Sequence, residues 1–136
     1  THVAVAERTL PDGWLNITSR GEQRFKYEIY GHKTNANDTF SVYLYLKDGD
    51  ILALTAPNAA ANTWYAEIYL NVWANANQYV HGCITLSGYA PVCTYASTTK
   101  AVSTGTVLLK AEIAETTNTA DVVTVDNVNI TYWKGL

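Results

Sequence analysis

The chain has 136 residues, of which 48% are hydrophobic and only 15% are charged, and its formal net charge at pH 7 is −3. This length suits one domain with one hydrophobic core, and the acidic balance argues against nucleic-acid binding, which depends on clustered Lys and Arg. No apolar run approaches the ~18 residues of a membrane span and no leader-like segment opens the chain, so we expect a mature, secreted protein without a membrane span.

Residues 1–10 are extended in character, and Pro11-Asp12-Gly13 separates them from Trp14. A strand isolated by such a hinge can pair with the sheet edge of a neighbouring subunit, where main-chain hydrogen bonds provide the affinity. The alternative is an ordinary first strand of the chain's own sheet, and both interpretations stay open. The candidate donor-strand residues are Val3, Ala4, Val5, Ala6 and Leu10, with residues 14–136 as the single sandwich domain.

Alternation of apolar and polar residues with period two dominates the chain, and no long segment has a helical period. The alternation predicts strands over 25–30 and 40–47, and a hairpin turn over 47–50 leads into a partner strand over 51–55. In that turn Asp48-Gly49 supplies the positive φ that a tight turn requires. Further strands are predicted over residues 64–72, 79–86, 107–113 and 122–133, with a long polar loop between the second and third of these.

The apolar phase changes within the last strand, because Val123 and Val125 alternate out of step with Val128, Ile130 and Tyr132. A β-bulge near Asp126-Asn127 would explain the switch. Short strands without a helix to cover a parallel sheet predict an all-β fold, a two-sheet antiparallel β-sandwich that is jelly-roll-like. The core is expected to contain Phe40, Val42, Leu44, Trp64, Ile68 and Leu70.

Cys83 and Cys93 lie ten residues apart and are predicted to form a disulfide, which an oxidising exterior would maintain. A metal site made of both cysteines and His81 is the weaker interpretation, because structural zinc takes four ligands. Secretion to the extracellular space or cell surface also agrees with three sequons, which mark the chain as a glycoprotein candidate. The sequons begin at Asn16, Asn37 and Asn129, and their alternation with apolar neighbours predicts that Asn16 and Asn129 face solvent.

No catalytic motif is recognisable in the sequence. Glycosidases need two carboxyl groups, one of them with a raised pKa, and Glu67 and Glu112 are the acids in mid-strand with aromatic neighbours. Both fall on the solvent phase of their strands, so we interpret them as ordinary surface acids and expect no enzyme activity.

Carboxylates in loops are the ligands that calcium selects, and Asp38, Asp48 and Asp50 are the candidates here. Their spacing is short of a complete calcium loop, and an ordinary turn is the competing interpretation. Apart from this calcium candidate, no metal and no other cofactor is expected.

The aromatic content is high, with four Trp and ten Tyr residues. Several of these lie on the non-core phase of the predicted strands, where their rings can stack on sugars, pack under another subunit or pair across strands. The candidates for an aromatic surface are Trp14, Tyr43, Tyr45, Tyr65, Tyr69 and Trp73.

The segment Val123 to Thr131 resembles the final strand of jelly-roll carbohydrate-binding modules, and the composition and layout of the whole chain resemble the jelly-roll subunits of archaeal extracellular threads and bundling pili. The second resemblance implies a structural subunit of an extracellular filament that assembles by β-strand donation between copies of itself. The first implies a non-catalytic carbohydrate-binding or lectin-like domain that uses surface Tyr and Trp. Glycans are expected as partners in either case, as covalent attachments or as ligands.

Overall fold

The computed structural model describes residues 2–34, 37, 39–115 and 122–134. Within these residues the chain forms nine strands and one short helical turn. The elements are β1 (Val3–Leu10), α1 (Ile17–Arg20), β2 (Gln23–Lys33), β3 (Phe40–Leu46), β4 (Gly49–Thr55), β5 (Thr63–Ala74), β6 (Asn77–Leu86), β7 (Val92–Thr98), β8 (Val107–Glu115) and β9 (Val123–Lys134).

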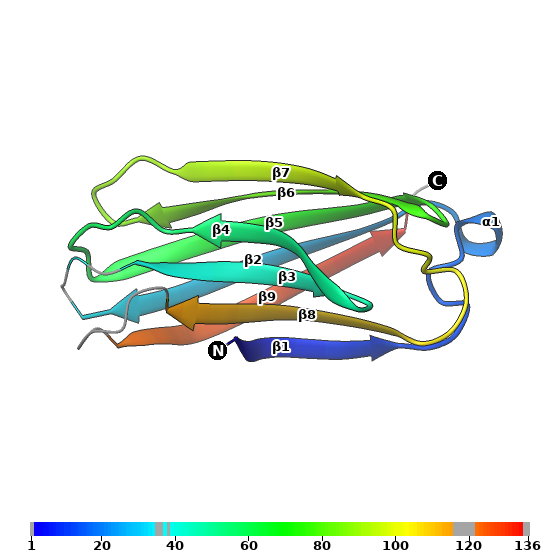
Figure 1. Cartoon of the computed structure of the whole chain (residues 1–136), viewed down its shortest axis with the longest axis horizontal. Coiled ribbons are helices and arrows are strands. Elements are labelled where there is room, and N and C mark those ends of the chain that lie inside the picture. The colour runs from blue at the N-terminus through cyan, green and yellow to red at the C-terminus, as the bar shows by residue number, and fades with distance from the viewer. Residues whose placement is uncertain (1, 35–36, 38, 116–121, 135–136) are drawn as a thin grey trace.

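The strands form two antiparallel sheets, a four-stranded sheet of order β1-β8-β3-β4 and a five-stranded sheet of order β7-β6-β5-β2-β9. The sheets pack face to face, and the four-stranded sheet lies nearer the viewer in Figure 1. Each sheet places an early strand beside a late one, β1 beside β8 and β2 beside β9. The predicted all-β, two-sheet antiparallel sandwich is therefore confirmed.

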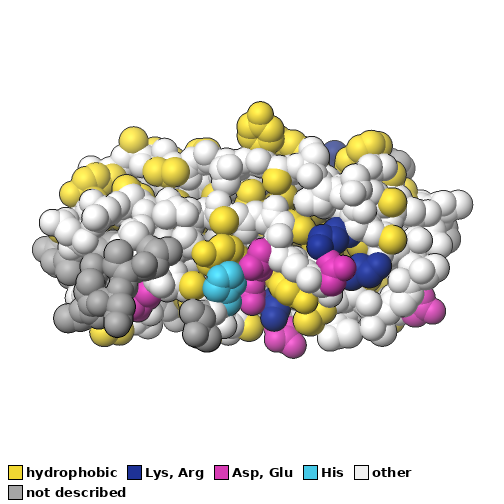
Figure 2. Space-filling view, in the orientation of Figure 1, with side chains coloured by type: hydrophobic (Ala, Val, Ile, Leu, Met, Phe, Trp, Pro, Cys, Tyr) yellow, Lys and Arg dark blue, Asp and Glu magenta, His cyan; other side chains and the backbone are white. Residues whose placement is uncertain are grey.

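Charged side chains are sparse on the face of the molecule drawn in Figure 2, as the composition predicts. Among the residues that the structure describes, no helix has the length and apolar character that crossing a membrane requires.

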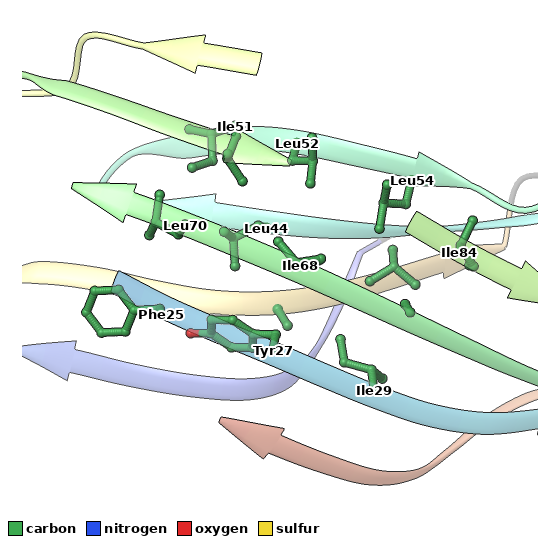
Figure 3. Close-up of a cluster of buried hydrophobic side chains, with 14 of the residues drawn as sticks. Phe25, Tyr27, Ile29, Leu44, Ile51, Leu52, Leu54, Ile68, Leu70 and Ile84 are labelled. Carbon is green, nitrogen blue, oxygen red and sulfur yellow. The ribbon is translucent and has the colours of Figure 1, made fainter. Parts of the chain in front are cut away.

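The core lies between the sheets and is built by every second residue of the strands (Figure 3). In β5, for example, Trp64, Ile68 and Leu70 point inward and are at most 3% exposed. The indole of Trp64 packs over Gly31 of β2, where an added Cβ would lie 2.3 Å from the ring. The six predicted core positions are all buried, namely Phe40, Val42, Leu44, Trp64, Ile68 and Leu70.

The bulge in the last strand is confirmed. Tyr30 of β2 pairs with Asn127 of β9, and Gly31 pairs with Val125, so Asp126 is the extra residue. The bulge lets Val123 and Val125 pack on the same core as Val128 and Tyr132. Because β9 is an edge strand, Ile130 is still 39% exposed.

Two local predictions are wrong in detail. The turn between β3 and β4 is closed by the Leu46–Gly49 pair, so Gly49 already belongs to the strand and the positive φ, 65°, falls on Lys47 instead. Cys93 does not lie in a loop but in β7, which pairs with β6. β7 is an exposed edge strand that contributes little to the core, so its sequence has no apolar alternation to reveal it.

Residues 3–10 pair with β8 of their own chain, so in this structure they form the first strand of their own sheet. A register shift between Ala4 and Ala6 makes Val5 the extra residue of a bulge. Among the candidate donor residues Leu10 is buried, Val5 and Ala6 are half-buried, and Val3 and Ala4 are exposed. β1 is thus held mainly through its backbone.

Candidate functional site

The outer face of the five-stranded sheet carries a continuous group of aromatic and charged side chains. It arises because the strands alternate strictly, so that the residues between the buried ones on β2, β5 and β6 all point outward. The antiparallel register brings Glu28 opposite Glu67 and Tyr30 opposite Tyr65. We call this surface the tyrosine face, and its side chains are Lys26, Glu28, Tyr30, Tyr65, Glu67, Tyr69, Tyr79, His81 and Tyr95.

The rings of the tyrosine face contact one another across the strands. Tyr69 stacks on His81 with the ring centroids 4.9 Å apart, and Tyr79 lies 5.5 Å from the same imidazole. Tyr30 and Tyr65 form a second pair, with centroids 4.7 Å apart. Tyr95 on the edge strand β7 is the most exposed of these rings, at 72%. The result is a pre-arranged row of aromatic surfaces with hydroxyl groups at the rims.

Two carboxylates lie between the ring pairs and share one hydroxyl. The Tyr65 hydroxyl donates a hydrogen bond to Glu67 Oε2 at 2.5 Å and lies 3.3 Å from Glu28 Oε2. Lys26 Nζ is 3.9 Å from a carboxylate oxygen of each of the two acids. The hydrogen bond from Tyr65, helped by Tyr69 and the charge of Lys26, lowers the pKa of Glu67 against the opposing effect of burial. Burial and the neighbouring Glu67 raise the pKa of the Tyr65 hydroxyl.

The lowered pKa of Glu67 does not suit the role of a catalytic acid. A glycosidase needs one carboxylic acid whose pKa is raised, so that it is protonated near neutral pH, whereas the pKa of Glu67 is lowered. An ionised carboxylate accepts hydrogen bonds from hydroxyl groups. An open depression of about 500 Å³ shares Tyr30 and Tyr65 with the tyrosine face, and its lining also includes Thr85 and Asp126.

The predicted aromatic surface divides between distant parts of the molecule. Tyr65 and Tyr69 belong to the tyrosine face, but Tyr43 and Tyr45 lie on β3 of the other sheet. There the imidazole of His2 stacks on Tyr43 at 4.0 Å, and Lys110 Nζ lies 4.4 Å from the centre of Tyr45.

Neither of the two predicted tryptophans lies among the stacked rings. Trp14 is partly buried against Tyr132 and Phe25, with centroid distances of 4.7 and 6.3 Å. Trp73 is 52% exposed and sits at the irregularity in register near the end of β5.

Sequence reasoning missed Glu28, Tyr30, Tyr79, His81 and Tyr95 as parts of this surface. The outward phase of β2 was visible in the sequence, but which strands are neighbours was not. The pairing of β2 with β5, and of β6 with β7, is what brings these residues to one place.

A second cluster, of His2, Asp50 and Glu112, lies on the outer face of the four-stranded sheet. His2 Nδ1 is 3.1 Å from Asp50 Oδ2 and 3.5 Å from Glu112 Oε1. Figure 2 shows a histidine beside acidic side chains on this face. Burial, followed by the neighbouring Glu112, raises the pKa of Asp50 to about 6.

The prediction that Glu112 is an ordinary surface acid is wrong, because its side chain is only 7% exposed although its position in the strand alternation points outward. Two side chains lie against it: His2, just before β1, is 3.5 Å from one carboxylate oxygen, and Nζ of Lys110, two residues earlier on β8, is 3.4 Å from the other. Glu67, the other acid of that prediction, is about one-third exposed.

The calcium candidates do not converge. Asp48 pairs with Lys100, whereas Asp50 belongs to the cluster with His2 and Glu112, and Asp38 lies outside the described residues. Cys83 and Cys93 form the predicted disulfide as register partners on β6 and β7, with Cα atoms 4.0 Å apart.

The sequon residues differ in exposure. Asn129 on β9 is exposed, as its place in the alternation predicts, and Asn37 is exposed as well. Asn16 is half-buried rather than in solvent, because the chain turns there: its backbone N–H donates to Gly13 O, and α1 begins at the next residue. Thr18 of the same sequon is exposed.

Comparison with known proteins yields no family model that matches the sequence and no curated protein with significant similarity to it.

Proposed function

We propose that the protein is a non-catalytic glycan-binding domain of the cell exterior and that the tyrosine face is its binding surface. The observation that carries this proposal is the joint placement of stacked tyrosine rings and the two carboxyl groups of Glu28 and Glu67 on one sheet face. Aromatic faces pack on the C–H faces of sugar rings, while carboxylates and tyrosine hydroxyls bind sugar hydroxyls.

The polarity of the face favours a hydroxyl-rich ligand over an apolar protein surface. The Tyr rings of this face carry hydroxyl groups, and the His81 ring is half-buried. Three charged side chains, Glu28, Glu67 and Lys26, lie among the rings. A protein–protein interface tends to deplete Lys and Glu at its centre. The extracellular location is supported by the disulfide, which persists in oxidising compartments.

The test is affinity for a panel of polysaccharides, namely cellulose, chitin, xylan and mannan, with three variants. Tyr69→Ala removes a stacking ring and Glu67→Gln removes the ionised acceptor, so each is expected to weaken binding about tenfold, equivalent to ~1.4 kcal/mol. Tyr45→Ala is the matched control, since Tyr45 lies on the other sheet. Equal binding by all three variants, or no binding to any of these polymers, would contradict the proposal.

A second candidate function is the structural subunit of an extracellular filament that exchanges β1 between copies. It is favoured by the weak packing of β1, in which Leu10 is the buried residue, and by its position at a sheet edge next to the Pro11–Gly13 turn. β1 of a neighbouring copy would pair with β8 in the same register as the chain's own β1, so the exchange would keep the backbone pairing between these two strands.

Paired cysteines at Thr9 and Leu108 test this second candidate, because these residues are register partners on β1 and β8. Exchange between copies predicts covalent multimers of Thr9→Cys/Leu108→Cys on non-reducing gels, and deletion of residues 1–10 should then abolish fibres seen by electron microscopy. A cross-linked product that is monomeric, from a preparation without fibres, would exclude strand exchange.

A further inference from the structure

We propose that His2, Asp50 and Glu112 form a binding site for a divalent transition-metal ion such as Zn²⁺. This site is separate from the tyrosine face and does not depend on the proposed function, because it lies on the opposite sheet.

The spacing of the three ligand atoms fits a small cation. One imidazole nitrogen and two carboxylate oxygens all lie within 4.8 Å of one another. Zn²⁺ bonds of about 2.0–2.2 Å in a tetrahedral arrangement place neighbouring ligand atoms about 3.4 Å apart. The distances from His2 Nδ1 to Asp50 and Glu112, 3.1 and 3.5 Å, are close to that value before any adjustment.

An unsatisfied oxygen of Glu112 is independent evidence that a ligand binds here. Its side chain is 7% exposed, and its Oε1 atom, which points toward His2, has no hydrogen-bond partner among the described residues. By contrast, Gln23, Lys33 and Gln78 are buried and bonded. A buried carboxylate oxygen without a partner costs free energy, and a bound cation would remove that cost.

The local charge also favours a cation. The cluster contains two acids, Asp50 and Glu112, and Lys110 pairs with Glu112, its Nζ lying 3.4 Å from Oε2. Lys110 contacts the Oε2 atom of Glu112, whereas the Oε1 atom is directed toward His2.

The types of ligand atom favour zinc over calcium. Calcium takes six to eight oxygen ligands, whereas one imidazole and two carboxylates suit zinc and related divalent ions. The stacking of His2 on Tyr43 holds the imidazole with Nδ1 toward the acids. His2 and Asp50 are 37% and 30% exposed, so a water molecule can occupy the remaining coordination position.

The ion would join three separate elements. Asp50 lies on β4 and Glu112 on β8, and His2 immediately precedes β1. A metal at this point would therefore fasten the N-terminal edge strand across the sheet, and its binding free energy would add to the stability of the folded state.

Calorimetric titration of the metal-stripped full chain with Zn²⁺, together with thermal unfolding, tests the site. We expect one Zn²⁺ per chain and a rise in Tm, and Co²⁺ should give the visible absorption of tetrahedral coordination. His2→Ala and Glu112→Gln should each weaken Zn²⁺ binding by more than about 100-fold, since losing even an outer partner of a metal ligand costs about 10–100-fold.

Glu112→Gln gives a second readout, because the neutral side chain removes the buried carboxylate whose Oε1 atom has no hydrogen-bond partner among the described residues. Its metal-free Tm is expected to equal or exceed that of the wild type, which shows that a lost Zn²⁺ response is not misfolding. His32→Ala is the matched control, since His32 also pairs with a carboxylate, that of Asp126, but lies on the other sheet. Unchanged Zn²⁺ affinity in His2→Ala and Glu112→Gln, or a response to Ca²⁺ in place of Zn²⁺, would overturn the proposal.

Discussion

At the scale of single residues, the position of one hydroxyl decides the chemistry of the tyrosine face. Tyr65 places its phenolic oxygen within hydrogen-bond distance of both Glu28 and Glu67. It can do so because Tyr65 neighbours Glu67 on the same face of β5, while Glu28 is the cross-strand partner of Glu67. This arrangement keeps Glu67 ionised and available to accept hydrogen bonds.

Replacement of Tyr65 by Phe is expected to raise the pKa of Glu67 toward its ordinary value, because the hydrogen bond from Tyr65 is the largest cause of its lowering. A lowered folded-state pKa stabilises the fold above the unfolded-state value of about 4.3 and loses that contribution as the pH falls through the folded-state value. The stability difference between wild type and Tyr65→Phe should thus be greatest at neutral pH and vanish in strong acid. Carboxyl NMR titration and unfolding at several pH values measure both effects.

Tyr69→Phe serves as the control for this experiment, since Tyr69 lowers the pKa of Glu67 less than Tyr65 does. A Glu67 pKa that stays unchanged in Tyr65→Phe would show that the hydrogen bond does not control the titration of this acid.

At the scale of elements, two of the four edge strands, β7 and β1, are held by different means. β7 has few buried side chains, and the Cys83–Cys93 bridge links it directly to β6. β1 has Leu10 in the core, and otherwise main-chain pairing with β8. An edge strand with little packing depends on such attachments, because its unpaired side remains open to solvent or to another chain.

Removal of the bridge by Cys83→Ala/Cys93→Ala is expected to cost about 2–3 kcal/mol of unfolding free energy, since the disulfide closes a short loop of the unfolded chain. Amide hydrogens of β7 should then exchange faster, while those of β2 and β5 in the middle of the sheet keep their relative protection. Denaturant unfolding and hydrogen exchange check both points. Ser97→Ala is a control on β7 outside the bridge, and a loss of the same size there would assign the effect to β7 packing and not to the bridge.

At the scale of the whole molecule, the two sheets share one hydrophobic core among the described residues. Leu44 comes from the four-stranded sheet and Ile68 from the five-stranded sheet, and both are 0% exposed within the same cluster (Figure 3). Neither sheet can bury its apolar face without the other, so the fold is expected to unfold as one cooperative unit.

Leu44→Ala and Ile68→Ala are each expected to lower the unfolding free energy by about 2–5 kcal/mol, the usual cost of a cavity in a packed core. Far-UV circular dichroism and the fluorescence of buried Trp64 should report the same midpoint in both variants. Two separate transitions, one for each sheet, would refute the shared core.

Sequence alone determined the class of fold, the core and the bulge of the last strand. These follow from alternation along one strand, which decides whether a residue points into or out of the sheet. The phase change between Val125 and Val128 could therefore be interpreted as a bulge, and the buried set from Phe40 to Leu70 could be named.

Only the tertiary structure decided which outward residues become neighbours, because alternation contains no information on strand order or register. It separated Tyr43 from Tyr65, placed Glu28 opposite Glu67, and brought His2 and Asp50 to Glu112. The burial of Glu112 has the same origin, since an outward phase means exposure only where no side chain from another part of the chain, here His2, covers it. The candidate sites of this protein are contacts between residues of different strands and of the segment before β1.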